Sequence, residues 1–156
     1  MGSDKIFLMR AIEIASKSID SGGGPFGAVI VKSGKLLSEG NNRVVQTTDP
    51  TAHAEVLAIR EAASVLGTHD LDGCTLYTSC EPCPMCLGAI YWAGIKKVKY
   101  ACDRNDAEEA GFSDKLIYEE IALDLGERKV SFIRMKETGG KEVFRKWNGM
   151  ADKIPY

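Results

Sequence analysis

The chain has 156 residues, of which 44% are hydrophobic and 27% charged, and its formal net charge is −2. These values are typical of one globular domain with its own core, and a slightly negative charge argues against a protein that mainly binds a polyanion. No apolar run reaches the roughly 18 residues of a membrane helix, and the N-terminus leads into an amphipathic pattern, unlike a signal peptide. We therefore expect a cytoplasmic protein without a membrane partner.

The first half of the chain predicts a helix followed by a β-hairpin. Leu8, Ile12 and Ile19 follow helical spacing within residues 4–20, and a run of glycines ends that helix. Residues rich in β-formers then predict two strands joined by a tight turn, followed by a polar loop. The predicted strands span residues 26–32 and 35–40, and the loop spans residues 41–50.

The second half alternates strands and helices. Asp49 and Pro50 signal the start of a helix that ends at Gly67, and Val143 and Trp147 share one face of the last helix. Helical crossovers make the third and fourth strands parallel. The pattern predicts an α/β fold, a three-layer α/β/α sandwich with a five-stranded mixed sheet. The remaining strands are expected at residues 74–79, 98–102 and 130–135, and the remaining helices at about 84–94 and 116–121.

Charge is segregated near the C-terminus. Residues 103–127 hold nine acidic and two basic side chains, whereas residues 128–153 hold eight basic and three acidic ones. We interpret both segments as solvated faces that contact each other or another subunit. The alternative is a basic C-terminal helix that contacts nucleic acid.

Two short motifs supply the ligands of a metal site. Residues 51–55 read TAHAE and residues 82–86 read PCPMC, which together form the H-x-E and P-C-x-x-C signature of zinc-dependent nucleobase deaminases. His53, Cys83 and Cys86 would bind one Zn²⁺ per chain and leave a fourth position for water. Glu55 would move protons as water attacks an sp² carbon that bears an amino group.

The other cysteines offer a competing interpretation. Cys80 with Cys83, Cys86 and His53 would make a closed structural zinc site, but a neighbouring carboxylate has no purpose there. We therefore expect Cys80 to be a small buried side chain, and we expect the same of Cys74 and Cys102. An odd number of cysteines also favours a reducing compartment over a disulfide framework.

Longer motifs resemble those of the cytidine deaminase-like superfamily along nearly the whole chain. These are GPFGA at residues 24–28, DPTAHAE at 49–55 and TSCEPCPMC at 78–86, and they are shared with tRNA adenosine deaminases. AIYWA at 89–93, EAGFSD at 109–114 and the terminal Tyr156 are most similar to the small bacterial guanine deaminases.

The resemblance implies hydrolysis of a free purine base, guanine and water giving xanthine and ammonia, in purine catabolism or salvage. It also implies a homodimer in which residues 115–156 of the single domain 1–156 are exchanged between subunits. The base would be bound by Phe26 as a stacking ring, Asn42 as a recognising amide, and Ala54, Trp92, Asp114 and Tyr156 as further parts of the pocket.

Two alternatives remain. One is a tRNA-specific adenosine deaminase that makes inosine, which the basic C-terminal segment favours and the acidic segment opposes. The other is a zinc-stabilised interaction module without catalysis. Residues 153–156 would bar a polynucleotide if they close over the pocket, so we consider nucleic acid a poor partner.

Overall fold

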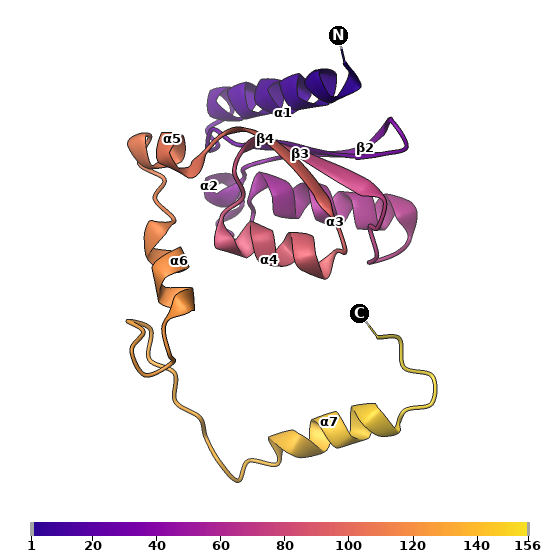
Figure 1. Cartoon of the computed structure of the whole chain (residues 1–156), viewed down its shortest axis with the longest axis vertical. Coiled ribbons are helices and arrows are strands. Elements are labelled where there is room, and N and C mark those ends of the chain that lie inside the picture. Colours follow the sequence, from indigo (N-terminus) through magenta and orange to yellow (C-terminus); the bar gives the residue numbers. More distant parts are fainter. Residues whose placement is uncertain (1, 156) are drawn as a thin grey trace. The chain divides into compact units, whose positions relative to one another are not determined.

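A four-stranded mixed sheet organises the first part of the chain (Figure 1). The computed structural model describes residues 2–155. The strand order is β2-β1-β3-β4, in which β1 pairs antiparallel with β2 and β3, and β3 pairs parallel with β4. The strands are β1 (Gly27–Lys32), β2 (Lys35–Asn41), β3 (Cys74–Cys80) and β4 (Lys97–Cys102).

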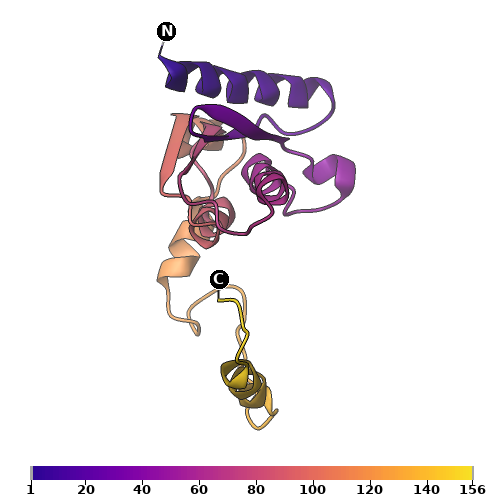
Figure 2. The ribbon, with the colours of Figure 1, turned by 90° about the vertical axis from the view of Figure 1, so that its right-hand side faces the viewer.

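Helices cover both faces of this sheet, as predicted. α1 (Ser3–Asp20) lies on one face, and α3 (Ala54–Leu66) and α4 (Pro84–Trp92) lie on the other (Figures 1 and 2). Side chains of β1 alternate between the two faces, because successive residues of a strand point to opposite sides. Ala28 and Ile30 enter the core beneath α3 and α4, whereas Val29 and Val31 pack beneath α1.

Close backbone approach fixes the start of α3 against the sheet. A Cβ at Gly40 in β2 would lie 2.2 Å from the carbonyl oxygen of Ala54, the first residue of α3. Only glycine permits this spacing, since real Cβ atoms do not come so near to a backbone oxygen. The position of His53, immediately before α3, is therefore set by the sheet.

Two short helices were not predicted. α2 (Val44–Thr47) lies in the expected polar loop, and α5 (Arg104–Glu109) follows β4. The Asp103 carboxylate caps α5 by accepting hydrogen bonds from the backbone N–H groups of Asn105 and Asp106, at 2.8 and 3.1 Å. Among the helices of residues 2–155, none is long and apolar enough to span a bilayer.

Residues 115–156 form a second unit, separate from Met1–Asp114. It contains α6 (Lys115–Ala122) and α7 (Gly140–Gly149), and none of its described residues is buried. The strand predicted at residues 130–135 is absent, so the prediction of five strands was wrong. A strand needs a neighbouring strand for its N–H and C=O groups, and residues 115–155 contain no other strand to pair with it.

Candidate metal and active site

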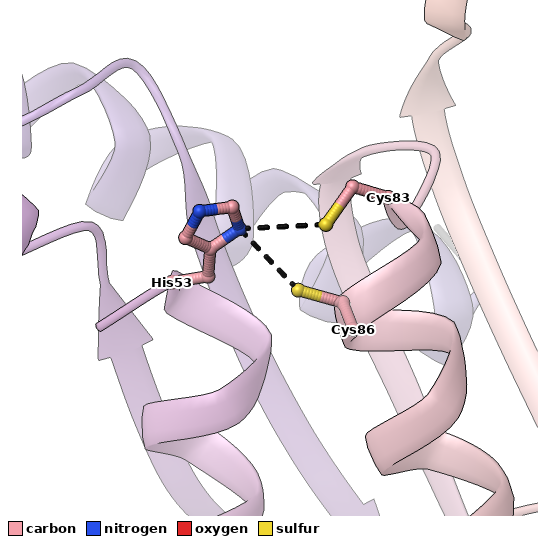
Figure 3. A group of neighbouring side chains, drawn as sticks. All are labelled: His53, Cys83 and Cys86. Atoms are coloured by element: carbon pink, nitrogen blue, oxygen red, sulfur yellow. Dashed lines mark hydrogen bonds between the residues drawn. The ribbon is translucent and has the colours of Figure 1, made fainter. Parts of the chain in front are cut away.

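Three predicted metal ligands converge where two helices begin. His53 precedes α3, while Cys83 precedes α4 and Cys86 lies in its first turn. The Nδ1 atom of His53 is 3.5 Å from each sulfur, and all three ligand atoms lie within 4.8 Å of one another (Figure 3). The two motifs, about 30 residues apart in sequence, therefore form one site.

The spacing of these atoms fits zinc. A tetrahedral ion with Zn–S bonds of about 2.3 Å and a Zn–N bond of about 2.0–2.1 Å separates nitrogen and sulfur ligands by about 3.5 Å. One imidazole and two thiolates are also ligands that Zn²⁺ prefers. Three protein ligands leave one tetrahedral position for water, as in catalytic zinc sites.

The protein stabilises negative charge at this cluster. Hydrogen bonding from Cys86, and then from His53, lowers the pKa of the Cys83 thiol. The neighbouring Cys83 in turn raises the pKa of Cys86 and, as its hydrogen-bond partner, that of His53. Both sulfurs lie near the N-terminus of α4, where the helix dipole favours an anion. The site therefore favours one thiolate even without a metal.

Glu55 lies beside the ligands in the first turn of α3. Its side chain is only 5% exposed, and this burial raises the pKa of its carboxyl group. The Thr78 hydroxyl donates a hydrogen bond to Oε1 at 2.9 Å, while Oε2 lies 3.4 Å from Cys86 Sγ. One carboxylate oxygen is thus fixed by β3, and the other faces the metal ligands.

Cys80 does not join the candidate cluster. Its thiol donates to the backbone oxygen of Asp103 at 3.4 Å, and burial raises its pKa to about 11. Among the described residues the cluster has three members, which argues against a closed four-ligand site. Cys74 and Cys80 are buried as predicted, but Cys102 is exposed, so that prediction was wrong. Cys102 ends the edge strand β4, most of whose residues are exposed or only half-buried.

Three of the predicted substrate residues surround the start of α3. Asn42 is buried, and its Oδ1 atom accepts the Val44 N–H at 3.3 Å, which orients the amide. Phe26 packs against the core beside α3. Ala54 is fully buried in that core.

The other three lie apart from that group or outside the described residues. Asp114 is half-buried, and burial, followed by the negative field of Cys83, raises the pKa of its carboxyl group. Trp92 is 70% exposed at the C-terminal end of α4. It lies six residues beyond Cys86, or about 9 Å along the helix axis. Tyr156 lies outside the described residues.

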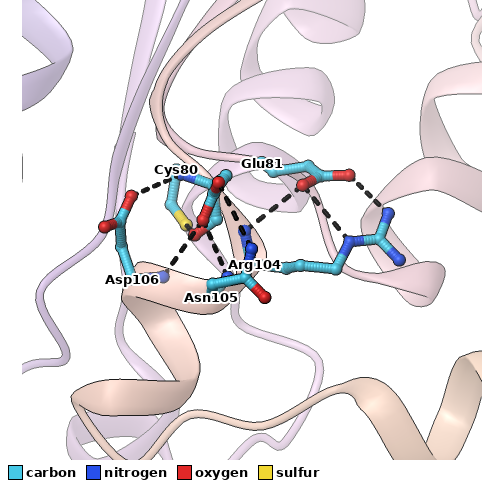
Figure 4. A network of polar contacts seen from close by, with 6 residues as sticks. Cys80, Glu81, Arg104, Asn105 and Asp106 are labelled. Carbon is cyan, nitrogen blue, oxygen red and sulfur yellow. Dashed lines mark hydrogen bonds and ion pairs between the residues drawn. The ribbon is translucent and has the colours of Figure 1, made fainter.

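Two contacts near this site have no counterpart among the residues predicted from the sequence. Glu81, in the turn before Cys83, pairs with Arg104 of α5 in the polar network shown in Figure 4. Phe112 packs edge-to-face on Phe26. Arg104 and Phe112 lie in the acidic segment 103–127, which the sequence described only by its charge. Asp103 is a favourable N-cap residue, and it was the one local signal for a helix there.

Comparison with known proteins places this geometry in context. Residues 1–102 match the family model described as the cytidine and deoxycytidylate deaminase zinc-binding region. Guanine deaminase of Bacillus subtilis is 54% identical over 151 residues, covering 96% of this chain and 97% of that protein. A crystal structure of guanine deaminase from that organism superposes with a TM-score of 0.95 and 53% identity, over 97% and 98% of the two chains. The tRNA-specific adenosine deaminase of B. subtilis is 36% identical over 140 residues, covering 90% and 86%.

The metal assignment predicts about one zinc per purified chain. Cys83→Ala and Cys86→Ala should each lose most of it, because two ligands cannot form the tetrahedral site. Cys102→Ala is the matched control and should keep the metal, since its sulfur is exposed and outside the cluster. Metal analysis by mass spectrometry measures all three, and full zinc content in the Cys83→Ala/Cys86→Ala double variant would contradict the site.

Proposed function

The chain belongs to the cytidine and deoxycytidylate deaminase family, and from this membership we propose that it hydrolyses guanine to xanthine and ammonia. The observation that carries the proposal is 54% identity to a guanine deaminase over 96% of the chain. The tRNA-specific adenosine deaminase is a weaker match at 36%. The 151 residues aligned with the guanine enzyme extend well beyond the 102 residues that the family model matches.

The site residues have distinct proposed roles. His53, Cys83 and Cys86 would hold Zn²⁺, and a zinc ion in such a site lowers the pKa of a bound water to about 7. Glu55 accepts a proton at Oε2, the oxygen that faces the ligands, while Thr78 holds Oε1 in place. This proton comes from the attacking water, and the carboxyl group passes it to the ring nitrogen. It then takes the second proton of that water and passes it to the amino group, which leaves as ammonia. The raised pKa of Glu55 suits it to hold a proton between these transfers.

Base recognition falls to the residues around the start of α3. The Asn42 amide can pair with a purine edge, because it offers both a donor and an acceptor. Phe26 stacks on the base. The Asp114 carboxylate would accept hydrogen bonds from the amino and ring N–H groups of guanine. Ala54, Trp92 and Tyr156 complete the proposed pocket.

A screen of free bases tests the proposal directly. Zinc-loaded protein is incubated with guanine, adenine, cytosine and 2,6-diaminopurine, and ammonia release is measured, beside an assay for inosine in tRNA. Guanine should be turned over, and the tRNA should remain unmodified. Inosine formation without guanine turnover would favour the tRNA enzyme, and inertness in both assays would favour a zinc-stabilised interaction module.

Glu55→Gln should separate metal binding from catalysis. The amide preserves the shape of the side chain but cannot carry the proton, so turnover of guanine should fall by about 10²–10⁴-fold or more. Zinc content should stay near one per chain. Glu61→Gln, on the exposed side of α3, is the matched control and should be fully active. Near-normal turnover by Glu55→Gln would mean that another group moves the protons.

We also propose that the protein is a cytoplasmic homodimer whose subunits exchange residues 115–156. The five cysteines are free, and thiolate ligands suit a reducing compartment. The second unit exposes apolar side chains that a monomer would rarely leave in water. They include Ile121, Val130, Ile133, Val143 and Phe144, each more than half exposed. A second copy of the chain is the occupant that supplies the same surfaces reciprocally.

Two hypotheses can be tested together: that subunits exchange residues 115–156, and that the C-terminal tail, residues 153–156, closes over the pocket. The test combines deletion of residues 154–156 with mixing of variants. The truncated chain should fold and bind zinc but deaminate guanine at least about tenfold more slowly, since an ordered tail excludes water from the pocket. The truncated chain is then refolded in a 1:1 mixture with Glu55→Gln. Random pairing makes half of the dimers mixed, and each mixed dimer has one complete site, in which an intact Glu55 meets the partner's intact tail. The mixture should therefore reach about a quarter of the full-length rate.

Truncated chains alone and Glu55→Gln chains alone are the controls, each refolded in the same way. Full activity of the truncated chain would contradict a closing tail. If the truncated chain deaminates guanine slowly and the mixture is no faster, the exchange is contradicted. The tail would then act within its own subunit.

A further inference from the structure

A ring pair links the proposed stacking residue to the loop after α5. The ring centroids of Phe26 and Phe112 are 5.0 Å apart and their planes meet at 86°. Phe26 also packs against the core, whereas Phe112 is 44% exposed. The partly exposed ring of Phe112 thus contacts Phe26, the residue proposed to stack on the base.

The geometry limits how the Phe26 ring can turn. A stacking ring helps a reaction only if it holds the base in one plane, and edge-to-face contact favours one orientation of the pair. We propose that Phe112 is a substrate-positioning residue, which holds the ring of Phe26 in the orientation that stacks on the base. This inference rests on the proposed guanine deaminase activity.

An ion pair fixes the segment that carries Phe112. Arg104 contacts the Glu81 carboxylate at 2.5 Å through Nη2 and at 3.3 Å through Nε, and its backbone N–H lies 3.2 Å from the same carboxylate (Figure 4). α5 has six residues, none of them buried, so apolar packing alone does not hold it. The forked guanidinium geometry therefore sets where α5 begins relative to the turn.

That turn is the one that presents the metal ligands. Glu81 lies two residues before Cys83, and its backbone N–H donates to the Cys102 oxygen at 2.8 Å. The segment from Arg104 to Phe112 is thus attached at one end to the metal-ligand turn and at the other to Phe26. Asp114 follows two residues later, so the same attachment places a second proposed contact to the base.

The test compares Phe112→Leu with Phe112→Tyr in steady-state kinetics on guanine, with zinc content and thermal midpoint measured in parallel. Phe112→Leu keeps apolar bulk but loses the ring, and KM should rise by about 2- to 12-fold while kcat stays within about twofold. Phe112→Tyr restores the ring and should restore KM. Phe7→Leu is the matched control, because Phe7 pairs with Tyr77 at 5.4 Å on the opposite face of the sheet, and it should leave KM unchanged.

Arg104→Gln provides a second measurement that does not alter the ring. It should raise KM in the same direction, whereas Arg10→Gln, which breaks the Arg10–Glu39 pair on α1, should not. If Phe112→Leu does not fold, Arg104→Gln decides the outcome.

The outcomes separate this inference from the proposed activity. A wild-type protein that does not release ammonia from guanine contradicts the activity itself. An active wild type with an unchanged KM in Phe112→Leu and Arg104→Gln overturns the positioning role. A lower thermal midpoint at unchanged KM would mean that both residues act only on stability, which also contradicts it.

Discussion

The structure depends on bringing two helix N-termini to the same end of one sheet. α3 and α4 each start with a metal ligand, and their N-termini supply partial positive charge to the thiolates between them. Gly40 lets β2 approach the first turn of α3 at backbone contact distance, so the sheet determines where His53 lies. Proline at the first position of α4 suits a helix start, where a backbone N–H would lack an intrahelical partner anyway. The frame matters because Zn–S and Zn–N bonds of about 2.0–2.3 Å require all three ligand atoms to surround one point.

The position of Glu55 beside the metal ligands affects the ionisation of its buried carboxyl group. Burying Glu55 opposes its ionisation, and one hydrogen bond from Thr78 compensates only part of that cost. A cation at the neighbouring ligands would supply the missing stabilisation. Ionisation of Glu55 therefore depends on the neighbouring metal site. A closed structural site would have no use for Glu55, which is why this residue distinguishes a reacting centre from a scaffold.

Local sequence signals predicted the core of the molecule well and its periphery poorly. Helical spacing placed α1, α3 and α4, and runs of β-forming residues placed the four strands, because these elements carry the apolar side chains of the core. Residues 130–135 carry the composition of a strand, yet they remain unpaired because pairing depends on another segment and not on composition. α5 was missed because it buries nothing and depends on a cap and on the Arg104–Glu81 pair. The ligands and Glu55 were predictable from spacing, whereas the contact of Phe112 with Phe26 joins residues 86 positions apart and has no local signature.

Substrate choice must arise outside the shared motifs. An amino group on an sp² carbon beside a ring nitrogen occurs in cytosine, adenine and guanine alike, so the ligands and Glu55 can serve any of them. The family model ends at residue 102, just before the segment that carries Arg104, Phe112 and Asp114. That segment is also strongly acidic, with nine acidic and two basic side chains in residues 103–127. Phosphate groups repel such a surface, whereas a free neutral base does not. The residues proposed to position the base and the acidic side chains that would repel a polynucleotide are therefore parts of the same stretch of chain.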